Sequence, residues 1–263
     1  MGLIKKGLTA FQLKIFALVI MTVDHIAAFK IAPMTNDIYM LMRVTGRIAA
    51  PLFLFLLTEG IRHTKNRAKY ILRLYIAGVI MQILREILVS APLGNIFQTF
   101  FYTALYITCA DKIVKIIKPK SQSGKIIFRP EYFIYLSVIS VIAHTQASGR
   151  AKIFLNIFFP SPFEAEYSFL FVLLGVTWYF INNKKINCAV FACLSVICGL
   201  FESRAGGGFT FWHLFTSAQW YMILAVPFIL IYNGKKGRGG LKYLFYVYYP
   251  AHQILFALLG AYF

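Results

Sequence analysis

Long apolar segments recur along this chain, and they restrict its fold more than any other feature. We expect nine membrane-spanning segments, at about residues 13–32, 38–61, 70–90, 95–117, 131–147, 166–182, 187–202, 211–232 and 242–262. A helix needs about 20 apolar residues to cross the hydrocarbon core of a bilayer. Lipid offers no partner to unpaired backbone groups, so each segment should be helical. The predicted fold class is therefore all-α: a polytopic membrane helix bundle forming a single integral-membrane domain over residues 1–263.

The overall composition agrees with a membrane protein. Charged residues make up 14% of the chain, hydrophobic residues make up 59%, and the mean hydropathy is +0.69. Soluble domains carry about a quarter charged residues, so the composition excludes an ordinary soluble domain. We expect a multi-pass protein of the inner or cytoplasmic membrane, with the lipid bilayer as its first partner and a homodimer as a possible assembly.

The basic residues are distributed unevenly between the predicted loops. If the N-terminus is cytoplasmic, the loops expected inside hold 19 of the 27 Lys and Arg residues, and those expected outside hold 3. Basic residues collect in cytoplasmic loops of membrane proteins. The pattern therefore predicts a cytoplasmic N-terminus and an outward C-terminus. It also accounts for the net positive charge without nucleic acid as a partner.

Ionisable residues interrupt the first two apolar segments. Asp24 and His25 lie within the first, and Arg43 and Arg47 lie within the second. Charges inside a membrane are costly and usually functional. The two arginines are four residues apart and share a helix face, at a depth similar to that of Asp24, so we expect them to pair with it. Two plainer interpretations stay open: a polar pair that only packs helices, and ion pairs with a structural role.

A second group of polar residues is expected at the cytoplasmic surface. Its members are Glu59, Arg62, His63, Lys65, Arg67, Arg73, Lys235 and Lys242. Cationic side chains suit a phosphate-bearing donor from the cytosol. The alternative is that they only set the topology. The four cysteines form no metal-binding pattern, and no metal is expected.

Four stretches of the sequence resemble the TraX family of membrane proteins. "LKIFALVIMTVDHIAA" (13–28) is similar to the opening of that family, where an Asp-His pair closes the first apolar helix. "RVTGRIAAPLFLFLLTEGIRHTKNRAKYILRL" (43–74) resembles its most recognisable block, and "LGNIFQTF" (93–100) resembles its Gly-Asn segment. The ending "QWYMILAVPFILIYNGKKGRGGLKYLFYVYYPAHQILF" (219–256) is similar too, with its Tyr-Pro-x-His.

The resemblance implies an activity. TraX proteins acetylate the amino terminus of pilin subunits, and they are similar to a wider group that includes acyltransferase-3 and heparan-α-glucosaminide N-acetyltransferase. Such enzymes take an acyl group from cytosolic acyl-CoA and deliver it to an acceptor across or within the membrane. The usual catalytic candidate is a histidine near the first helix, which His25 matches. The other residues on family-like motifs are Arg47, Glu59, Arg73, Asn95 and His252.

These observations predict an acetyl-CoA-dependent N-acetyltransferase. His25 would act as general base for an acceptor amine or peptide, and Asp24 with Arg43 or Arg47 would hold the polar geometry. Asn95, Gln219 or Arg47 would stabilise the oxyanion, and His252 is the reserve base. Acetyl-CoA would contact the cytoplasmic group of residues listed above, together with Arg43.

Three alternatives stay open. An O-acetyltransferase would use the same base on a sugar or cell-envelope hydroxyl. A proton-coupled transporter would use the buried charges as a relay. A haem-binding electron carrier would use His25, His144 or His252 as axial ligands.

Overall fold

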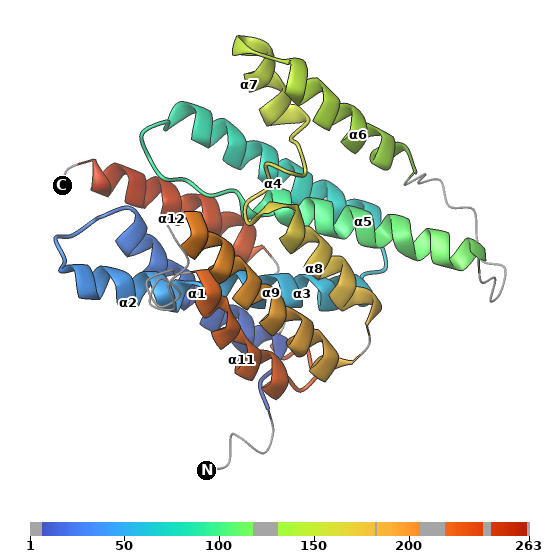
Figure 1. The fold of residues 1–263 in the computed structure, drawn as a ribbon, viewed down its shortest axis with the longest axis horizontal. Helices are drawn as coiled ribbons and strands as arrows, with labels where there is room; N and C mark the ends of the chain where they lie inside the picture. The colour runs from blue at the N-terminus through green and yellow to red at the C-terminus, as the bar shows by residue number, and fades with distance from the viewer. Residues whose placement is uncertain (1–6, 118–130, 182, 206–218, 239–242, 262–263) are drawn as a thin grey trace. The chain divides into compact units, whose positions relative to one another are not determined.

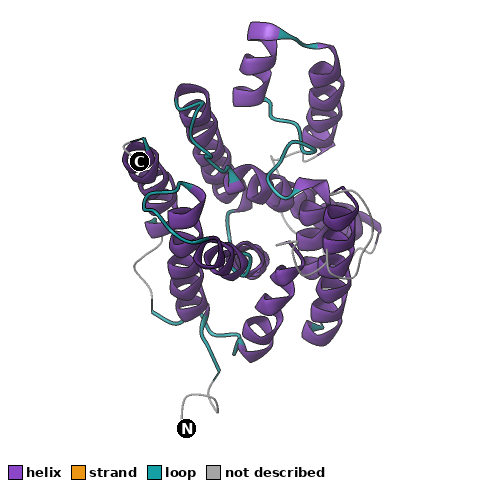
Figure 2. Ribbon diagram, turned by 60° about the vertical axis from the view of Figure 1, so that its left-hand side comes forward, coloured by secondary structure: helices purple, strands orange, loops and turns teal. Residues whose placement is uncertain are grey.

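The computed structural model describes residues 7–117, 131–181, 183–205, 219–238 and 243–261. Within these residues the chain is helical (Figure 1), and Figure 2 shows the described residues as helices joined by loops and turns. One parallel bridge, between Leu8 and Tyr232, is the β-type pairing that the described part contains. The prediction of an all-α fold is confirmed for this part of the chain.

The chain divides into two compact units, and each is described by itself. The first comprises Met1–Leu56 with Ile181–Phe263, and the second comprises Leu57–Phe180. The first unit holds α1 (Ala10–Ala28), α2 (Asn36–Gly46), the beginning of α3 (Ala49–Arg62), α9 (Lys184–Ala205), η1 (Gln219–Ala225), α11 (Val226–Ile231) and α12 (Leu244–Gly260). The second holds the end of α3, α4 (Arg67–Ile87), α5 (Ile96–Ile117), α6 (Glu131–Gln146), α7 (Gly149–Phe158) and α8 (Ser168–Phe180). The assignment of the whole chain to one membrane domain stays a prediction.

Each unit has its own buried core. In the first unit, the largest fully buried side chains are Leu13, Leu52, Leu54, Phe191, Met222 and Ile229. In the second, they are Ile61, Met81, Phe97, Leu105, Ile107 and Trp178. Helix α1 packs against α2 and α12 in the first unit, and α5 packs against α4 and α8 in the second.

Among the residues that the structure describes, three stretches are long and apolar enough to cross a membrane. They are Ala10–Ala28, Asn36–Arg62 and Lys184–Phe201, and shorter apolar helices cover Ser168–Phe180, Gln219–Ile231 and Leu244–Gly260. Large apolar side chains such as Leu41 (67% exposed) and Val247 (66%) lie on the helix surfaces. Such exposure suits contact with lipid. The count of nine spans and the cytoplasmic N-terminus stay predictions.

The N-terminus of α1 is joined to the chain that follows α11. The Thr9 hydroxyl caps the helix by accepting a hydrogen bond from the Gln12 N–H. In the reverse direction, the Thr9 N–H donates to Oε1 of Gln12. The N–H groups of Ala10 and Phe11 donate to the carbonyls of Lys235 and Lys236, at 2.8 and 3.1 Å. The first donors of a helix have no partner within it. Here residues 235 and 236 supply that partner, which fixes where α1 begins.

The predicted second span is two helices rather than one. Helix α2 ends at Gly46 and α3 begins at Ala49, with N–H groups of Arg47 and Ile48 bonded three residues back to Val44 and Thr45. Pro51 explains the break, because it has no N–H to donate to the carbonyl of Arg47 and its ring crowds that carbonyl. The interruption places Arg47 at the end of α2, next to the polar residues of α1.

Candidate active site

Two histidines from helices far apart in the sequence meet in the first unit. Nδ1 of His25, on α1, lies 2.6 Å from Nε2 of His252, on α12. The rings are parallel to within 8° and their centroids are 4.9 Å apart. Because the two nitrogens are in hydrogen-bond contact while the ring centroids are well separated, the two rings meet edge to edge through one hydrogen bond. His252 is buried, at 5% exposed, and His25 is partly buried.

The surrounding bonds determine which nitrogen carries each proton. Nδ1 of His252 lies 2.7 Å from the Tyr248 carbonyl, which can only accept, so this nitrogen carries a proton. In the neutral ring, Nε2 of His252 is then an acceptor, and Nδ1–H of His25 must donate to it. One nitrogen of His25 remains unprotonated, Nε2. The pair therefore holds His25 in the tautomer whose Nε2 can take up a proton.

A second contact fixes the same two helices one turn away. The Thr22 hydroxyl donates to the Leu18 carbonyl at 2.8 Å and lies 2.6 Å from the Tyr248 hydroxyl, which therefore donates to it. The Tyr248 ring lies parallel to that of His252, with centroids 4.9 Å apart. Residues three or four apart share a helix face. The two side-chain bonds thus hold the facing sides of α1 and α12 in a single register.

An ion pair lies beside this dyad. Both Arg43 and Arg47 were predicted to pair with Asp24, and Nη1 of Arg43 donates to its Oδ1 at 2.8 Å. A Cβ at Gly46 would overlap the Asp24 side chain, so glycine permits the close approach of α2 to α1. Arg47 interacts electrostatically with both Asp24 and His25. Its Nε is buried and has no hydrogen-bond partner within the described residues.

This arrangement supplies the groups that an acyl transfer needs. A ring nitrogen of fixed tautomer can act as general base. Guanidinium groups next to it can stabilise negative charge that develops on a neighbouring oxygen. His25, Asp24, Arg43, Arg47 and His252 are brought together by three helices of the first unit.

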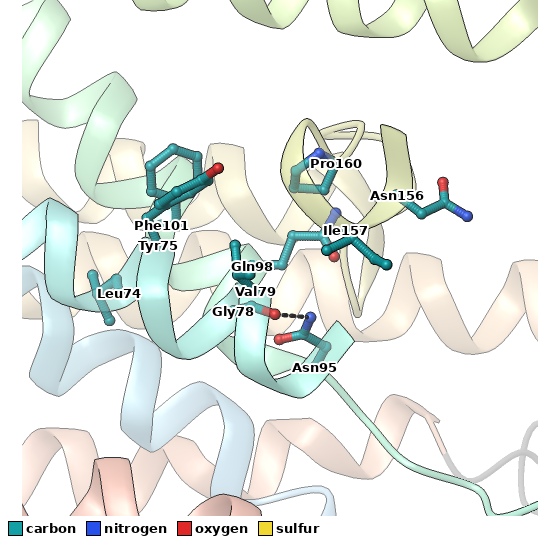
Figure 3. Close-up of a pocket in the computed structure, with 10 residues that line it drawn as sticks. All are labelled: Leu74, Tyr75, Gly78, Val79, Asn95, Gln98, Phe101, Asn156, Ile157 and Pro160. Carbon is teal, nitrogen blue, oxygen red and sulfur yellow. Dashed lines mark hydrogen bonds between the residues drawn. The ribbon is translucent and has the colours of Figure 1, made fainter. Parts of the chain in front are cut away.

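Asn95 belongs to the second unit, where it lines a small cavity (Figure 3). Its Nδ2 donates to the Gly78 carbonyl at 3.0 Å, which links the start of α5 to α4. Its Oδ1 is buried without a partner in the described part of the chain. The cavity measures about 10 Å³, the size of a single water molecule rather than of a thioester. Asn95 thus joins two helices, and its role on an oxyanion stays a prediction.

Arg62 and Arg67, which were predicted to bind the phosphates of acetyl-CoA, contact other protein groups within the second unit. Nη2 of Arg62 donates to the carbonyls of Trp178 and Tyr179, at 2.8 and 2.7 Å, at the end of α8. Arg67 pairs with Asp111 at 2.7 Å and donates to the Tyr179 hydroxyl at 2.7 Å. Both guanidinium groups lie over the Tyr179 ring, 5.4 and 5.5 Å from its centroid. We call these residues the Tyr179 clasp.

The other residues of the second unit that were predicted to bind acetyl-CoA are Glu59, Arg73, His63 and Lys65. Oε1 of Glu59 lies 3.5 Å from Nε of Arg62 on α3. Arg73 lies over the Tyr70 ring, 5.8 Å from its centroid. His63 and Lys65 are exposed between α3 and α4.

In the first unit, Lys235 is exposed after α11, and Gln219 begins η1. Lys242 lies outside the described residues. No cluster of three or more His, Cys, Asp or Glu side chains that could hold a metal ion occurs among the residues that the structure describes.

The direct contact between His25 and His252 was not predicted from the sequence. Both were candidates, but 227 residues separate them and no local pattern joins them. Their shared feature is that each lies, with one polar neighbour, within an otherwise apolar stretch: His25 next to Asp24 and His252 next to Gln253. The Tyr179 clasp was missed for a similar reason, because Asp111 and Tyr179 are far from Arg67 in sequence.

Comparison with known proteins places the chain in a family. The family described as TraX protein matches residues 10–260. The "Probable fimbrial assembly protein FimC, serogroup H1" of Dichelobacter nodosus is 28% identical over 258 residues, which cover 94% of this chain and 93% of that protein. No solved structure matches. The match to residues 10–260 covers nearly all of this sequence, so the chain belongs to the TraX family.

Proposed function

We propose that this protein is a membrane-embedded acetyltransferase that moves acetyl from cytosolic acetyl-CoA to an amine, with the N-terminus of a pilin-like peptide as the favoured acceptor. The observation that carries the proposal is the His25–His252 pair, which leaves Nε2 of His25 unprotonated. The acceptor class is supported by the relative named as a probable fimbrial assembly protein. In this view the family shares its chemistry with other transmembrane acyltransferases.

The proposed reaction is direct transfer. The neutral acceptor amine attacks the carbonyl carbon of the acetyl thioester, and its N–H proton passes to Nε2 of His25 as the C–N bond forms. The C–S bond then breaks, and the departing sulfur takes the proton from Nε2. Amine and acetyl-CoA become amide and CoA, and His25 returns to its starting form.

The charged neighbours of His25 have separate roles in this proposal. Arg47, whose Nε has no partner among the described residues, is the group available to the oxyanion of the tetrahedral intermediate. Arg43 is held by Asp24 at 2.8 Å, and this ion pair keeps the end of α2 next to α1. His252 acts through His25 and is a positioning residue.

The proposed donor contact uses basic side chains without internal partners. Lys235, Lys236 and Arg238 are exposed after α11, and none pairs with a carboxylate in the described part of the chain. Ammonium and guanidinium groups bind phosphate oxygens. Arg62 and Arg67 already bind groups of the second unit, so their first role in this proposal is structural.

The competing functions differ in what they need from the dyad. Transfer to a sugar hydroxyl would use the same base and the same donor. Haem ligation would require an iron between nitrogens that are in direct hydrogen-bond contact at 2.6 Å, and the helices would have to separate to admit it. A transporter would not bind acetyl-CoA and would form no acetylated product.

The test uses the full chain in lipid nanodiscs with radiolabelled acetyl-CoA. Three acceptors are compared: a peptide with a free N-terminus, the same peptide with its N-terminus blocked, and a hydroxyl-bearing saccharide. Label in the free peptide alone is the predicted result. Label in the saccharide alone would favour the O-acetyltransferase. Absence of any product, together with no thermal stabilisation by CoA, would contradict an acetyltransferase and favour a transporter.

A further inference from the structure

Lys30 adopts a backbone conformation that usually belongs to glycine. Helix α1 ends with the Lys30 N–H bonded to the Ala27 carbonyl and the Ile31 N–H bonded to the Ile26 carbonyl, at 3.1 and 3.4 Å. This is the Schellman arrangement, in which the residue after the cap is left-handed and is most often Gly. Lys30 has φ 50° there. A strained non-glycine residue is a reason to look for a use of its side chain.

The Lys30 side chain lines an open cleft at the turn between α1 and α2. The cleft has a volume of about 540 Å³, and its lining residues are Lys30, Ala32, Pro33, Met34, Asn36 and Tyr39. Pockets for small ligands span about 300–1,000 Å³. The size is therefore sufficient for one or two side chains of a bound peptide.

The polar groups of this cleft can donate hydrogen bonds. Its polar lining residues are Lys30, Asn36 and Tyr39, whose side chains carry an ammonium, an amide and a hydroxyl group. The ammonium of Lys30 makes no ion pair with a carboxylate of the described residues. Asp37, next along α2, does not line the cleft. A carboxylate can form an ion pair with such an ammonium group and accept hydrogen bonds from two neutral donors.

The cleft lies at the end of α1 that carries the proposed base. Lys30 follows His25 by five residues, which in a helix amount to an axial rise of about 7.5 Å and a turn of about 140° around the axis. An extended peptide covers about 3.3–3.6 Å per residue, so at least two residues are needed to span the rise. The third side chain of a peptide with its amine at His25 is therefore the first that can reach Lys30.

We infer that the cleft of Lys30, Asn36 and Tyr39 is the acceptor subsite that recognises a carboxylate near the third residue of the acetylated peptide. This inference rests on the proposed function and specifies its acceptor: a peptide with a free N-terminal amine and an acidic side chain shortly after it. Lys30 is a specificity-determining residue and takes no part in the bond-forming step.

The experiment compares three synthetic peptides that differ only at position 3, where they carry Glu, Gln or Lys. The full chain in nanodiscs of zwitterionic lipid should acetylate the Glu peptide with a kcat/KM about fivefold above that of the Gln peptide, the scale of one exposed ion pair. The Lys peptide should be the poorest substrate.

Two variants of Lys30 make the test independent of folding. Lys30→Gly suits the left-handed backbone, so its thermal stability should match or exceed that of the parent protein, while the preference for Glu over Gln should disappear. Lys30→Glu should reverse the order and favour the Lys peptide. Lys185→Glu, an exposed change of equal charge at the start of α9, should leave the preference intact.

The outcomes separate this inference from the proposed function. Transfer to none of the peptides would overturn both. Equal transfer to all three, unchanged in the Lys30 variants, would overturn the subsite and leave the acetyltransferase standing. Loss of transfer to every peptide in a folded Lys30→Gly protein would overturn it too, by placing Lys30 in the reaction. So would an effect of Lys30 that follows added anionic lipid instead of peptide charge, because Lys30 would then bind a headgroup.

Discussion

His25 and His252 are joined by a 2.6 Å hydrogen bond between Nδ1 and Nε2, and a further 2.7 Å bond runs from Nδ1 of His252 to the Tyr248 carbonyl. This chain of two bonds gives the rings different tasks. His252 is an acceptor toward His25 and a donor to the backbone, whereas His25 keeps one nitrogen available.

Removing His252 should slow acetyl transfer without eliminating it. His252→Phe keeps an aromatic ring in the α1–α12 contact but cannot accept a hydrogen bond from Nδ1–H of His25, so the tautomer of His25 is no longer fixed. We expect kcat to fall by about 10- to 100-fold, the range seen for residues that orient a metal-binding histidine through a hydrogen bond, while KM for acetyl-CoA changes little. His252→Gln, whose amide oxygen can accept that hydrogen bond, should recover part of kcat. A uniform loss in both variants would contradict the positioning role.

Gly46 should be intolerant of even the smallest side chain. A Cβ there overlaps Asp24, so Gly46→Ala must push α2 away from α1 and weaken the Asp24–Arg43 pair. We expect a destabilisation of about 1–3 kcal/mol, the usual cost of overpacking, measured as a lower Tm in detergent. Gly60→Ala is the matched control, because the nearest atom to its Cβ would be 3.7 Å away. It should be neutral or stabilising, and equal effects at both positions would argue against the close contact.

Arg67 should affect stability more than donor binding. Arg67→Met removes the 2.7 Å pair with Asp111 and the bond to the Tyr179 hydroxyl, and we expect a loss of about 2 kcal/mol. Asp111→Asn should cost less when combined with Arg67→Met than on its own, which a double-mutant cycle measures.

Lys235→Ala is the complementary variant for the donor contact. It should raise KM for acetyl-CoA with little change in Tm, because the Lys235 side chain is exposed. If Arg67→Met instead raised KM at unchanged stability, the phosphate role first suggested by the sequence would be the correct one.

The orientation predicted from the loop charges can be tested by reporter fusions. A fluorescent protein that folds only in the cytosol should fluoresce at the N-terminus, and a phosphatase active only outside should be active at the C-terminus. Reporters after residues 64 and 90 should give cytoplasmic and external signals, respectively. The same side at both of these positions would contradict a span over 70–90.

The features predictable from the sequence are those with a local cause. Apolar length indicated most helices of the described residues, but α7 (Gly149–Phe158) lies between two predicted spans and was not predicted. The four-residue spacing of Arg43 and Arg47 indicated an arginine partner for Asp24. The break at Arg47 also has a local cause, in Pro51. It was not predicted, because the apolar residues on both sides of it suggested one continuous span. The contacts of His25 with His252, and of Arg67 with Asp111 and Tyr179, depend on how distant helices pack. No pattern within one segment contains that information.

The most direct test of the central claim is acetyl transfer by His25→Ala. The purified variant, in nanodiscs with radiolabelled acetyl-CoA and a free peptide, is compared with the parent protein under single-turnover conditions. We predict that transfer falls to background while acetyl-CoA still raises the Tm of the variant as it does that of the parent. Transfer at the parent rate would contradict the assignment of His25 as the base.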